Sequence, residues 1–304
     1  MISLLNALPG AVAQGLIWGI MAIGVYITYR ILDIADLTVD GSLCTGGAVC
    51  IMLMLGGQNV WVALLGALLA GMAAGLATGL LHTFMGIPAI LAGILTQLGL
   101  YSINLKAMGK ANQAINVDKF NLLVSLRFTK NVPFYKNSIL IVAVMIIVLI
   151  LILYWFFGTE LGCSLRATGC NDKMARAQGI NTDFNRVLGL MISNGLVALS
   201  GALLAQYQGF ADINMGRGAI VIGLAAVIIG EAVFGKVFRN FGFRLLGVAL
   251  GSIIYYLVMQ FVIWLGIDTD LLKFLQAAVV AVFLAIPTWK ERYFSKPVKK
   301  GGQN

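Results

Sequence analysis

The chain has 304 residues, of which 60% are hydrophobic and only 11% are charged, and its mean hydropathy is +0.93. Soluble domains carry roughly 25% charged residues, so this composition excludes an ordinary soluble protein and predicts an all-α polytopic membrane protein. The formal net charge of +9 does not indicate nucleic-acid binding, because the basic residues gather in short loops and near the C-terminus, where they orient membrane helices.

Apolar runs of about 20 residues, each able to cross a hydrocarbon layer of roughly 30 Å, recur along the whole chain. We therefore predict one transmembrane domain over residues 1–304 with about nine spans, and the pattern allows eight to ten. The spans are expected near residues 10–29, 34–55, 60–84, 87–106, 138–157, 187–206, 218–235, 245–265 and 272–289.

The basic tail at residues 290–304 predicts a cytosolic C-terminus. Counting back through nine spans places the N-terminus and the segment 107–136 outside and the loop 158–183 in the cytosol. The outer segment is itself basic, against the usual bias, and a short extra helix within it would change the number of spans.

Two short motifs suggest an internal repeat. Ala35–Val39 (ADLTV) resembles Ala211–Met215 (ADINM), and each motif follows one long apolar run and leads into another. In the predicted topology the first motif enters its span from the cytosol and the second from outside, as an inverted repeat requires. A chance match of five residues is the alternative.

Glycines repeat at four-residue spacing in three of the spans, which lets helix backbones approach closely. They serve either packing within one subunit or, at one face, a dimer interface. The repeats are Gly15/Gly19, Gly71/Gly75/Gly79 and Gly247/Gly251.

Three carboxylates, Asp33, Asp36 and Asp40, fall at i, i+3 and i+7, the spacing of one helical face. A charged side chain at the bilayer centre costs about 2.5–3.5 kcal/mol, so they are not expected to face lipid. They belong either to an interfacial loop whose carboxylates cap the next helix or to the translocation path or its cytosolic gate. On the second interpretation, the candidate pathway residues are Asp36, Thr38, Asp40, Ser42, Gln97 and Asn194.

Glu231 is a membrane-embedded acidic residue late in the seventh expected span. Lys236 follows a little over one turn later, so an ion pair at the helix end is the first interpretation and a substrate or proton site is the second. The stretch Gly230–Lys236 also matches GxxxxGK, but Val237 stands where a phosphate loop needs Ser or Thr, and no strand precedes it. We therefore predict no ATPase site on this chain.

Metal chemistry and catalysis are not expected either. The four cysteines show no CxxC spacing, and His82 is the single histidine. We predict no metal site and no catalytic residues, so the chain is expected to be a transport subunit and not an enzyme.

The most informative stretch is Gly162–Asn181 (GCSLRATGCNDKMARAQGIN), a polar segment between two apolar spans. A membrane hairpin needs only a few turn residues, so a helix-forming segment here indicates a surface for a cytosolic partner. Asn171 and Asp172 are suited to cap a short helix, and Gly179 is suited to end it. Three basic residues keep the segment in water: Arg166, Lys173 and Arg176.

Together with Gly158–Leu161, this loop resembles the cytosolic loop of ABC importer permeases of the branched-chain amino acid/ribose superfamily, whose pattern is T-x-x-G…R-A-x-G-x-N…A…G-I. Leu37–Ser42 resembles the D-L-S-V-G segment of that family, and Ala225–Gly235 resembles its A-A-V-I-I-G-G-x-x-x-G segment. The chain departs from the family at Glu231 and Asp40, where glycine is usual. These features are closer to a sub-branch whose binding proteins take amino acids, including aromatic ones.

The resemblance implies the permease of an ATP-binding-cassette importer in the bacterial cytoplasmic membrane, acting as a lipid-embedded homodimer with an extracellular substrate-binding protein and a separate ATPase. ATP and magnesium would bind the ATPase, and this chain would hold no cofactor. The loop would be a coupling helix seated in a cleft of the ATPase, through Arg166, Ala167, Gly169, Asn171, Asp172, Ala175, Arg176 and Gly179.

A rival function from a different class is an ion-gradient-driven secondary transporter or channel. It would use the membrane-embedded carboxylates Asp36, Asp40 and Glu231. Such a protein would move its substrate alone, whereas an importer permease needs its ATPase.

Overall fold

Seven helices long and apolar enough to cross a membrane dominate the computed structural model, which describes residues 2–117, 119–120, 122–129, 137–235, 237–238, 240–265, 271, 274–283 and 285. They are α1 (Ile2–Tyr26) with its π-helical continuation η1 (Ile27–Ile31), α2 (Thr38–Leu55), α3 (Val60–Thr83), α4 (Ala89–Met108), α5 (Ser138–Gly158), α8 (Thr182–Gln208) and α10 (Phe241–Trp264).

Two shorter apolar helices, α9 (Ala219–Phe234) and Phe274–Phe283, fall within the two remaining expected spans. Each of the nine predicted spans thus contains one apolar helix of the described chain. The predicted all-α polytopic fold is confirmed.

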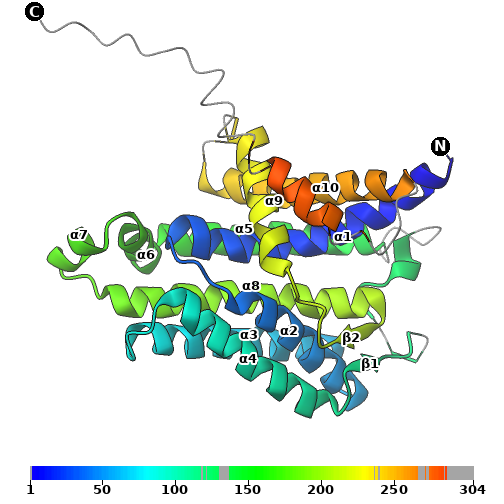
Figure 1. Cartoon of the computed structure of the whole chain (residues 1–304), viewed down its shortest axis with the longest axis horizontal. Helices are drawn as coiled ribbons and strands as arrows, with labels where there is room; N and C mark the ends of the chain where they lie inside the picture. Colours follow the sequence, from blue (N-terminus) through cyan, green and yellow to red (C-terminus); the bar gives the residue numbers. More distant parts are fainter. Residues whose placement is uncertain are drawn as a thin grey trace, which may run out of the picture.

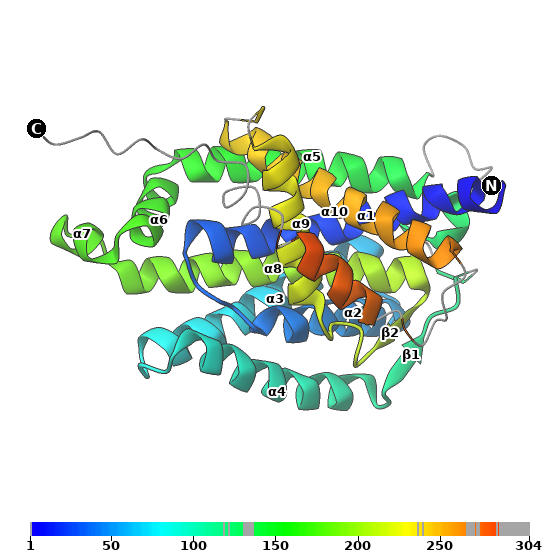
Figure 2. The ribbon, with the colours of Figure 1, turned by 45° about the horizontal axis from the view of Figure 1, so that its top comes forward.

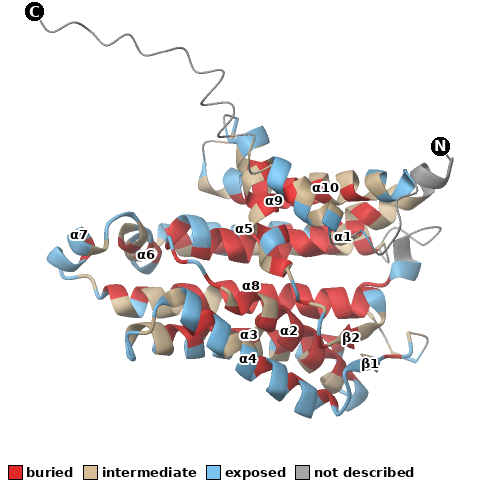
Figure 3. Cartoon of the chain, viewed as in Figure 1, coloured by how far each residue is buried: buried red, intermediate tan, exposed pale blue. Residues whose placement is uncertain are grey.

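The helices differ strongly in burial (Figure 3). In their membrane-spanning stretches, 78% of the residues of α8 are buried but only 22% of those of α5. α8 lies at the centre and packs against α1, α2 and α3. α5 has the highest mean hydropathy of the seven, 3.3, as expected of a helix that turns most of its surface away from the rest of the chain.

The predicted glycine repeats all lie against helices of the same chain. A Cβ at Gly15 would lie 2.8 Å from the Cα of Ile253 in α10, and one at Gly75 would collide with the backbone of Leu190 in α8. A Cβ at Gly251 would collide with the carbonyl oxygen of Ala226 in α9. The close approach of backbones therefore serves packing within one subunit at these positions.

The two ends of the helix bundle carry different structures (Figures 1 and 2). At one end the short helices α6 (Glu160–Cys170) and α7 (Asp172–Ala177) project between α5 and α8. At the other end, near the N-terminus, strands β1 (Asn112–Ala114) and β2 (Phe210–Asp212) pair antiparallel. The described parts of the segment 107–136 and of the loop 158–183 thus lie at opposite ends, and after α4 ends at Met108 the described part of 107–136 has only β1 and the short 3₁₀-helix η2 (Leu126–Thr129).

The packing has the pattern of an inverted repeat that relates α1–α2–α3 to α8–α9–α10. α1 packs against α10 and α9, as α8 packs against α3 and α2, and α1 lies beside α8 in both ribbon views. The two similar motifs also make the same local bond. The amide of Thr38 donates to Asp36 at 2.9 Å, and the amide of Asn214 donates to Asp212 at 2.7 Å.

Candidate translocation path and coupling surface

Asp36 is the centre of a buried polar network. It lies in the non-helical link between η1 and α2 and is 2% exposed. Its Oδ1 accepts the amide of Thr38, and its Oδ2 accepts Nδ2 of Asn194 at 2.7 Å. The amide oxygen of Asn194 accepts the hydroxyl of Ser42 at 2.6 Å. The link, α2 and α8 are therefore tied together by side chains whose polar atoms are satisfied, as buried polar groups require.

The network extends from α2 to α3 and α4 through threonine hydroxyls. Oγ1 of Thr38 lies 2.7 Å from Oγ1 of Thr78, which donates to Thr96 at 2.9 Å. Four of the six predicted pathway residues belong to this network or its extension: Asp36, Thr38, Ser42 and Asn194. They hold the bundle together at the point where α2 begins.

The prediction that Asp33, Asp36 and Asp40 share one helical face is wrong. Residues 32–37 are not helical, because η1 ends at Ile31 and Asp33 has a positive φ of 55°. Asp33 is exposed, Asp36 is buried and Asp40 begins α2. The three carboxylates consequently point to different surroundings.

Asp40 caps a helix far away in the sequence. Its carboxylate accepts the backbone amides of Gly218 and Ile220, both at 3.0 Å, at the N-terminus of α9. A carboxylate is favourable there because the first amides of a helix lack intrahelical partners and carry positive partial charge. Of the two interpretations of the carboxylates, capping thus describes Asp40, although the capped helix is not the next one in the chain.

Asp40 also lines a small cavity together with Gln97. The cavity measures about 120 Å³, and its polar wall includes Asn104, which donates to Thr45 at 3.1 Å, and Arg217. Gln97 is partly buried and lies across this cavity from Asp40 on α4. The predicted pathway residues therefore divide between a closed network and this cavity.

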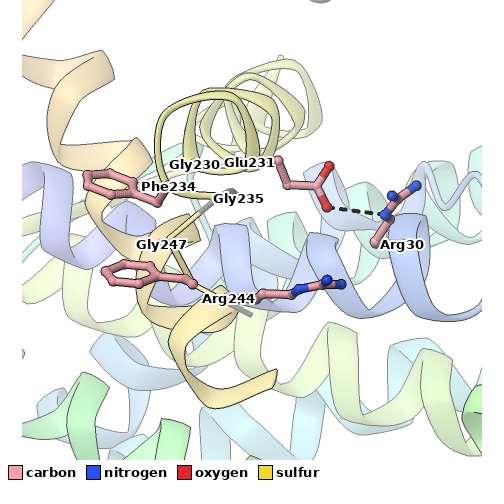
Figure 4. Close-up of a pocket in the computed structure, with 8 residues that line it drawn as sticks. Arg30, Gly230, Glu231, Phe234, Gly235, Arg244 and Gly247 are labelled. Carbon is pink, nitrogen blue, oxygen red and sulfur yellow. Dashed lines mark ion pairs between the residues drawn. The ribbon is translucent and has the colours of Figure 1, made fainter. Parts of the chain in front are cut away.

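Glu231 pairs with Arg30, while the expected partner Lys236 lies outside the described residues. Oε1 of Glu231 lies 3.1 Å from Nε of Arg30 at the end of η1. The pair borders a cavity of about 240 Å³ that also has Phe234 and Arg244 in its wall (Figure 4). The two side chains are 58% and 34% exposed, so the pair, which joins α9 to η1, stabilises the fold little.

The loop between α5 and α8 forms two capped helices. The Thr159 side chain accepts the amide of Gly162 and begins α6, and the Asn171 side chain accepts the amide of Met174 and begins α7. Gly179 has a φ of 81°, which glycine adopts without strain. Its amide donates to Arg176 and the next amide to Ala175, the bonds of a Schellman motif. The predicted cap and stop of the short helix are both present.

The loop is seated firmly on the ends of two membrane helices. A Cβ at Gly169 would collide with the carbonyl oxygen of Ile31, so α6 lies directly on η1. The guanidinium of Arg166 lies over the ring of Phe241, 5.6 Å from its centroid, at the start of α10. α6 is therefore in contact both with η1, which carries Arg30, and with the start of α10.

Several residues expected to meet a partner are occupied within the chain. Ala175 is 1% exposed, so the prediction that it offers a docking surface is wrong, because α7 turns this side chain inward. Arg176 pairs with Asp172 at 3.4 Å and Asp183 at 2.9 Å, and Arg186 pairs with Asp172 at 3.2 Å. The outward surface of α7 instead includes Lys173 and the 56%-exposed Met174.

The described part of the chain contains neither a cluster of metal ligands nor a phosphate loop. No group of three His, Cys, Asp or Glu residues is arranged there to hold a metal. Cys44 and Cys50 are buried and free, and Cys163 and Cys170 are exposed and free. In the GxxxxGK match, residues 230–234 are helical at the end of α9 and Gly230 packs on Gly247, while Lys236 lies outside the described residues. A helical backbone does not form a phosphate cradle.

Comparison with known proteins decides the family. Residues 8–284 match the family model described as "Branched-chain amino acid transport system / permease component". This chain belongs to that permease family. It is the membrane-spanning subunit of an ABC importer, a transport subunit and not an enzyme, and permeases of this kind work with an ATPase and a substrate-binding protein.

The permease is similar over most of its length to three curated proteins. It is 40% identical to the "Tyrosine transport system permease protein" of Clostridioides difficile (strain R20291), over 92% of this chain and 91% of that one. It is 36% identical to "Uncharacterized protein RP368" of Rickettsia prowazekii (strain Madrid E), over 92% and 98%. It is 30% identical to the "Autoinducer 2 import system permease protein LsrC" of Yersinia pestis (strain Pestoides F), over 89% and 68%.

Two basic residues of the permease escaped the sequence prediction. Arg30 was not singled out, although its position after the first span places it at the same end as Glu231. Arg217 was not singled out, because nothing local distinguishes it from other loop arginines. In the structure it borders both the cavity of Asp40 and a second, larger cavity.

Proposed function

We propose that the permease carries an amino acid, tyrosine or a close relative of it, inward across the bacterial cytoplasmic membrane. Two copies form the path, and ATP hydrolysis on two docked ATPase subunits drives it. The substrate assignment is supported by the 40% identity to a permease whose name specifies tyrosine. The departures at Asp40 and Glu231 point to the same sub-branch.

The observation that carries this proposal is the seating of the α6–α7 loop. It is a two-helix unit that projects from one end of the bundle (Figure 2), and ion pairs join α7 to the start of α8. It rests on η1 through Gly169 and on α10 through Arg166. Such a unit can transmit the closing of an ATPase to membrane helices, whereas a solvated loop without these contacts would absorb the motion.

We propose that α6 and α7 face the cytosol and that the β1–β2 pair and the N-terminus lie outside. Arg30, Arg166 and Arg186 gather at the α6–α7 end, which agrees with the positive-inside bias. ATP and magnesium bind the ATPase subunit, since the GxxxxGK match on this chain is helical. The exposed apolar rows of α4 and α5 meet lipid or the second copy.

The coupling surface is tested by placing a charge on it. Met174→Asp adds a negative charge to the exposed surface of α7, and we expect substrate-stimulated ATP hydrolysis of the reconstituted complex to fall at least fivefold. Asn112→Asp adds the same charge at the other end, on exposed β1, and should leave coupling unchanged. Equal coupling in the two variants and the wild type would refute the role of α7.

The same reconstitution separates the importer from a gradient-driven transporter. Proteoliposomes with the permease, the ATPase and the binding protein should accumulate substrate only when ATP reaches the ATPase. Accumulation by the permease alone, driven by a proton or sodium gradient, would contradict ATP-driven import.

A further inference from the structure

A second cavity of the permease, at the end opposite α6 and α7, has the chemistry of an amino-acid site. It measures about 320 Å³, within the roughly 300–1,000 Å³ of small-molecule sites. Its wall combines residues of α1, α9, the last half of α10, the helix 274–283 and the segment after β2. Its polar and aromatic members are Gln14, Trp18, Asn214, Arg217, Tyr256, Gln260 and Gln276.

Arg217 is an unpaired cation at this site. It is exposed, lines the cavity and forms no ion pair with any carboxylate of the described chain, although Asp40 and Asp212 lie on neighbouring segments. It lies in the segment between β2 and α9 and not within a membrane helix. Its planar guanidinium matches a carboxylate through two parallel hydrogen bonds.

Trp18 supplies a second, independent observation that points to a ligand. Its side chain lines the cavity and is 6% exposed, and its indole nitrogen is buried without a hydrogen-bond partner in the described residues. A buried indole N–H normally finds an acceptor, because leaving it unpaired costs free energy. A ligand oxygen in the cavity would satisfy this donor once the ring turns its buried nitrogen toward the cavity. The Trp18 ring also contacts Tyr256, 5.8 Å between centroids, and gives the cavity an aromatic wall.

The glutamines complete the recognition of both charged groups of an amino acid. Gln14, Gln260 and Gln276 are partly buried, and no hydrogen bond within the described chain occupies their amides. Their carbonyl oxygens can accept from an ammonium group, which the cation Arg217 cannot do. A ligand with a carboxylate at Arg217, an ammonium among the amides and an aromatic ring beside Trp18 uses every part of the wall.

We propose that this cavity is an outer binding site for a free aromatic amino acid, in which Arg217 binds the carboxylate and the Trp18 indole donates to the same molecule. This inference rests on the proposed function, because it assumes that the permease transports an amino acid. It adds a site on the permease itself, so that selection for the carboxylate is not left to the binding protein alone.

The test measures binding of radiolabelled L-tyrosine to the wild-type permease–ATPase complex in lipid nanodiscs. We expect saturable binding that tyramine, which lacks the carboxylate, displaces at least tenfold less effectively than L-tyrosine does. Arg217→Gln should weaken binding at least tenfold, and Arg217→Lys should weaken it less, since it keeps the charge but loses the paired donors. Lys110→Gln removes a positive charge from an exposed site at the same end and should bind like the wild type.

Trp18→Phe is the second variant, because it keeps an aromatic ring and removes only the unpartnered donor. It should weaken L-tyrosine binding severalfold while gel filtration and basal ATP hydrolysis remain normal. If Arg217→Gln does not assemble, L-tyrosine binding by Trp18→Phe and Arg217→Lys is measured instead. Unchanged binding in both variants overturns the proposal.

The outcomes distinguish this site from the proposed function and from a lipid site. Wild-type complexes that import no amino acid would contradict the proposed function. Normal import with equal L-tyrosine binding in the wild type and Arg217→Gln would overturn the cavity alone. Phosphatidylglycerol retained in native mass spectra of the wild type and lost in Arg217→Gln, without any binding of L-tyrosine, would show a lipid headgroup site and overturn it as well.

Discussion

Asp36 shows how one buried carboxylate can organise several helices. Its two oxygens accept from the backbone of Thr38 and from Asn194, so the link before α2 is fixed to α8. Asp33 lies three residues earlier but is exposed. The two residues are thus a matched pair that differs mainly in burial and in hydrogen bonding.

Replacing Asp36 by asparagine should destabilise the permease by about 1–3 kcal/mol, because an amide group can accept only through its oxygen and would turn its NH₂ toward one of the two donors. The readout is the Tm of the purified chain in detergent. Asp33→Asn is the control and should leave the Tm unchanged, since asparagine tolerates a positive φ well. Equal Tm values for the two variants would show that the network does not stabilise the fold.

At the residue scale the sequence indicated which polar residues matter more readily than it indicated which residues they contact. Asp36, Thr38, Ser42 and Asn194 were selected as polar residues in apolar spans, and the structure brings them together. The prediction that Asp33 and Asp40 share a helical face with Asp36 was wrong, because residue spacing does not reveal that a helix ends at Ile31. The pairing of Glu231 with Arg30 was missed because the two lie 201 positions apart in the chain.

Among the elements, α6 is the one on whose position the proposed coupling to the ATPase depends. Gly169 allows it to touch the Ile31 carbonyl, and Arg166 fixes it over Phe241. Capping and stop residues predicted the α7 boundaries correctly. The inward direction of Ala175 was not predictable, because a single turn of helix has too few residues to define a buried face.

Gly169→Val should uncouple the importer. The added side chain would collide with η1 and displace α6, so substrate-stimulated ATP hydrolysis should fall at least fivefold while the chain still inserts into the membrane. Gly158→Ala is the matched control, because a Cβ there meets nothing within 4 Å in the described structure. ATP hydrolysis coupled normally in Gly169→Val would show that the contact between α6 and η1 is dispensable.

For the whole molecule, apolar run length predicted the order of the apolar helices because the bilayer fixes how long a span must be, and seven of the nine expected spans contain a helix long enough to cross a membrane. The arrangement of those helices was not predictable in the same way. It depends on which glycine faces which backbone, and this information is distributed over pairs of distant segments. The short motif shared by residues 35–39 and 211–215 was the single local sign of the repeat.

The orientation of the molecule can be read from its own cysteines. Cys163 and Cys170 are exposed at the α6–α7 end, whereas Cys44 and Cys50 are buried. A membrane-impermeant maleimide should label inside-out vesicles but not intact cells. In a Cys163→Ser/Cys170→Ser background, Asn112→Cys should show the reverse. Labelling of the native cysteines in intact cells would place α6 and α7 outside and contradict the proposed direction.

The bonds from Asp40 to the amides of Gly218 and Ile220 join the beginning of α2 to the beginning of α9, one from each half of the repeat. If the halves rock against each other, this contact is a natural pivot. The two helix starts must either move as one body around it or break both bonds before they separate. The carboxylate therefore favours rearrangements of the halves that keep both of these hydrogen bonds intact.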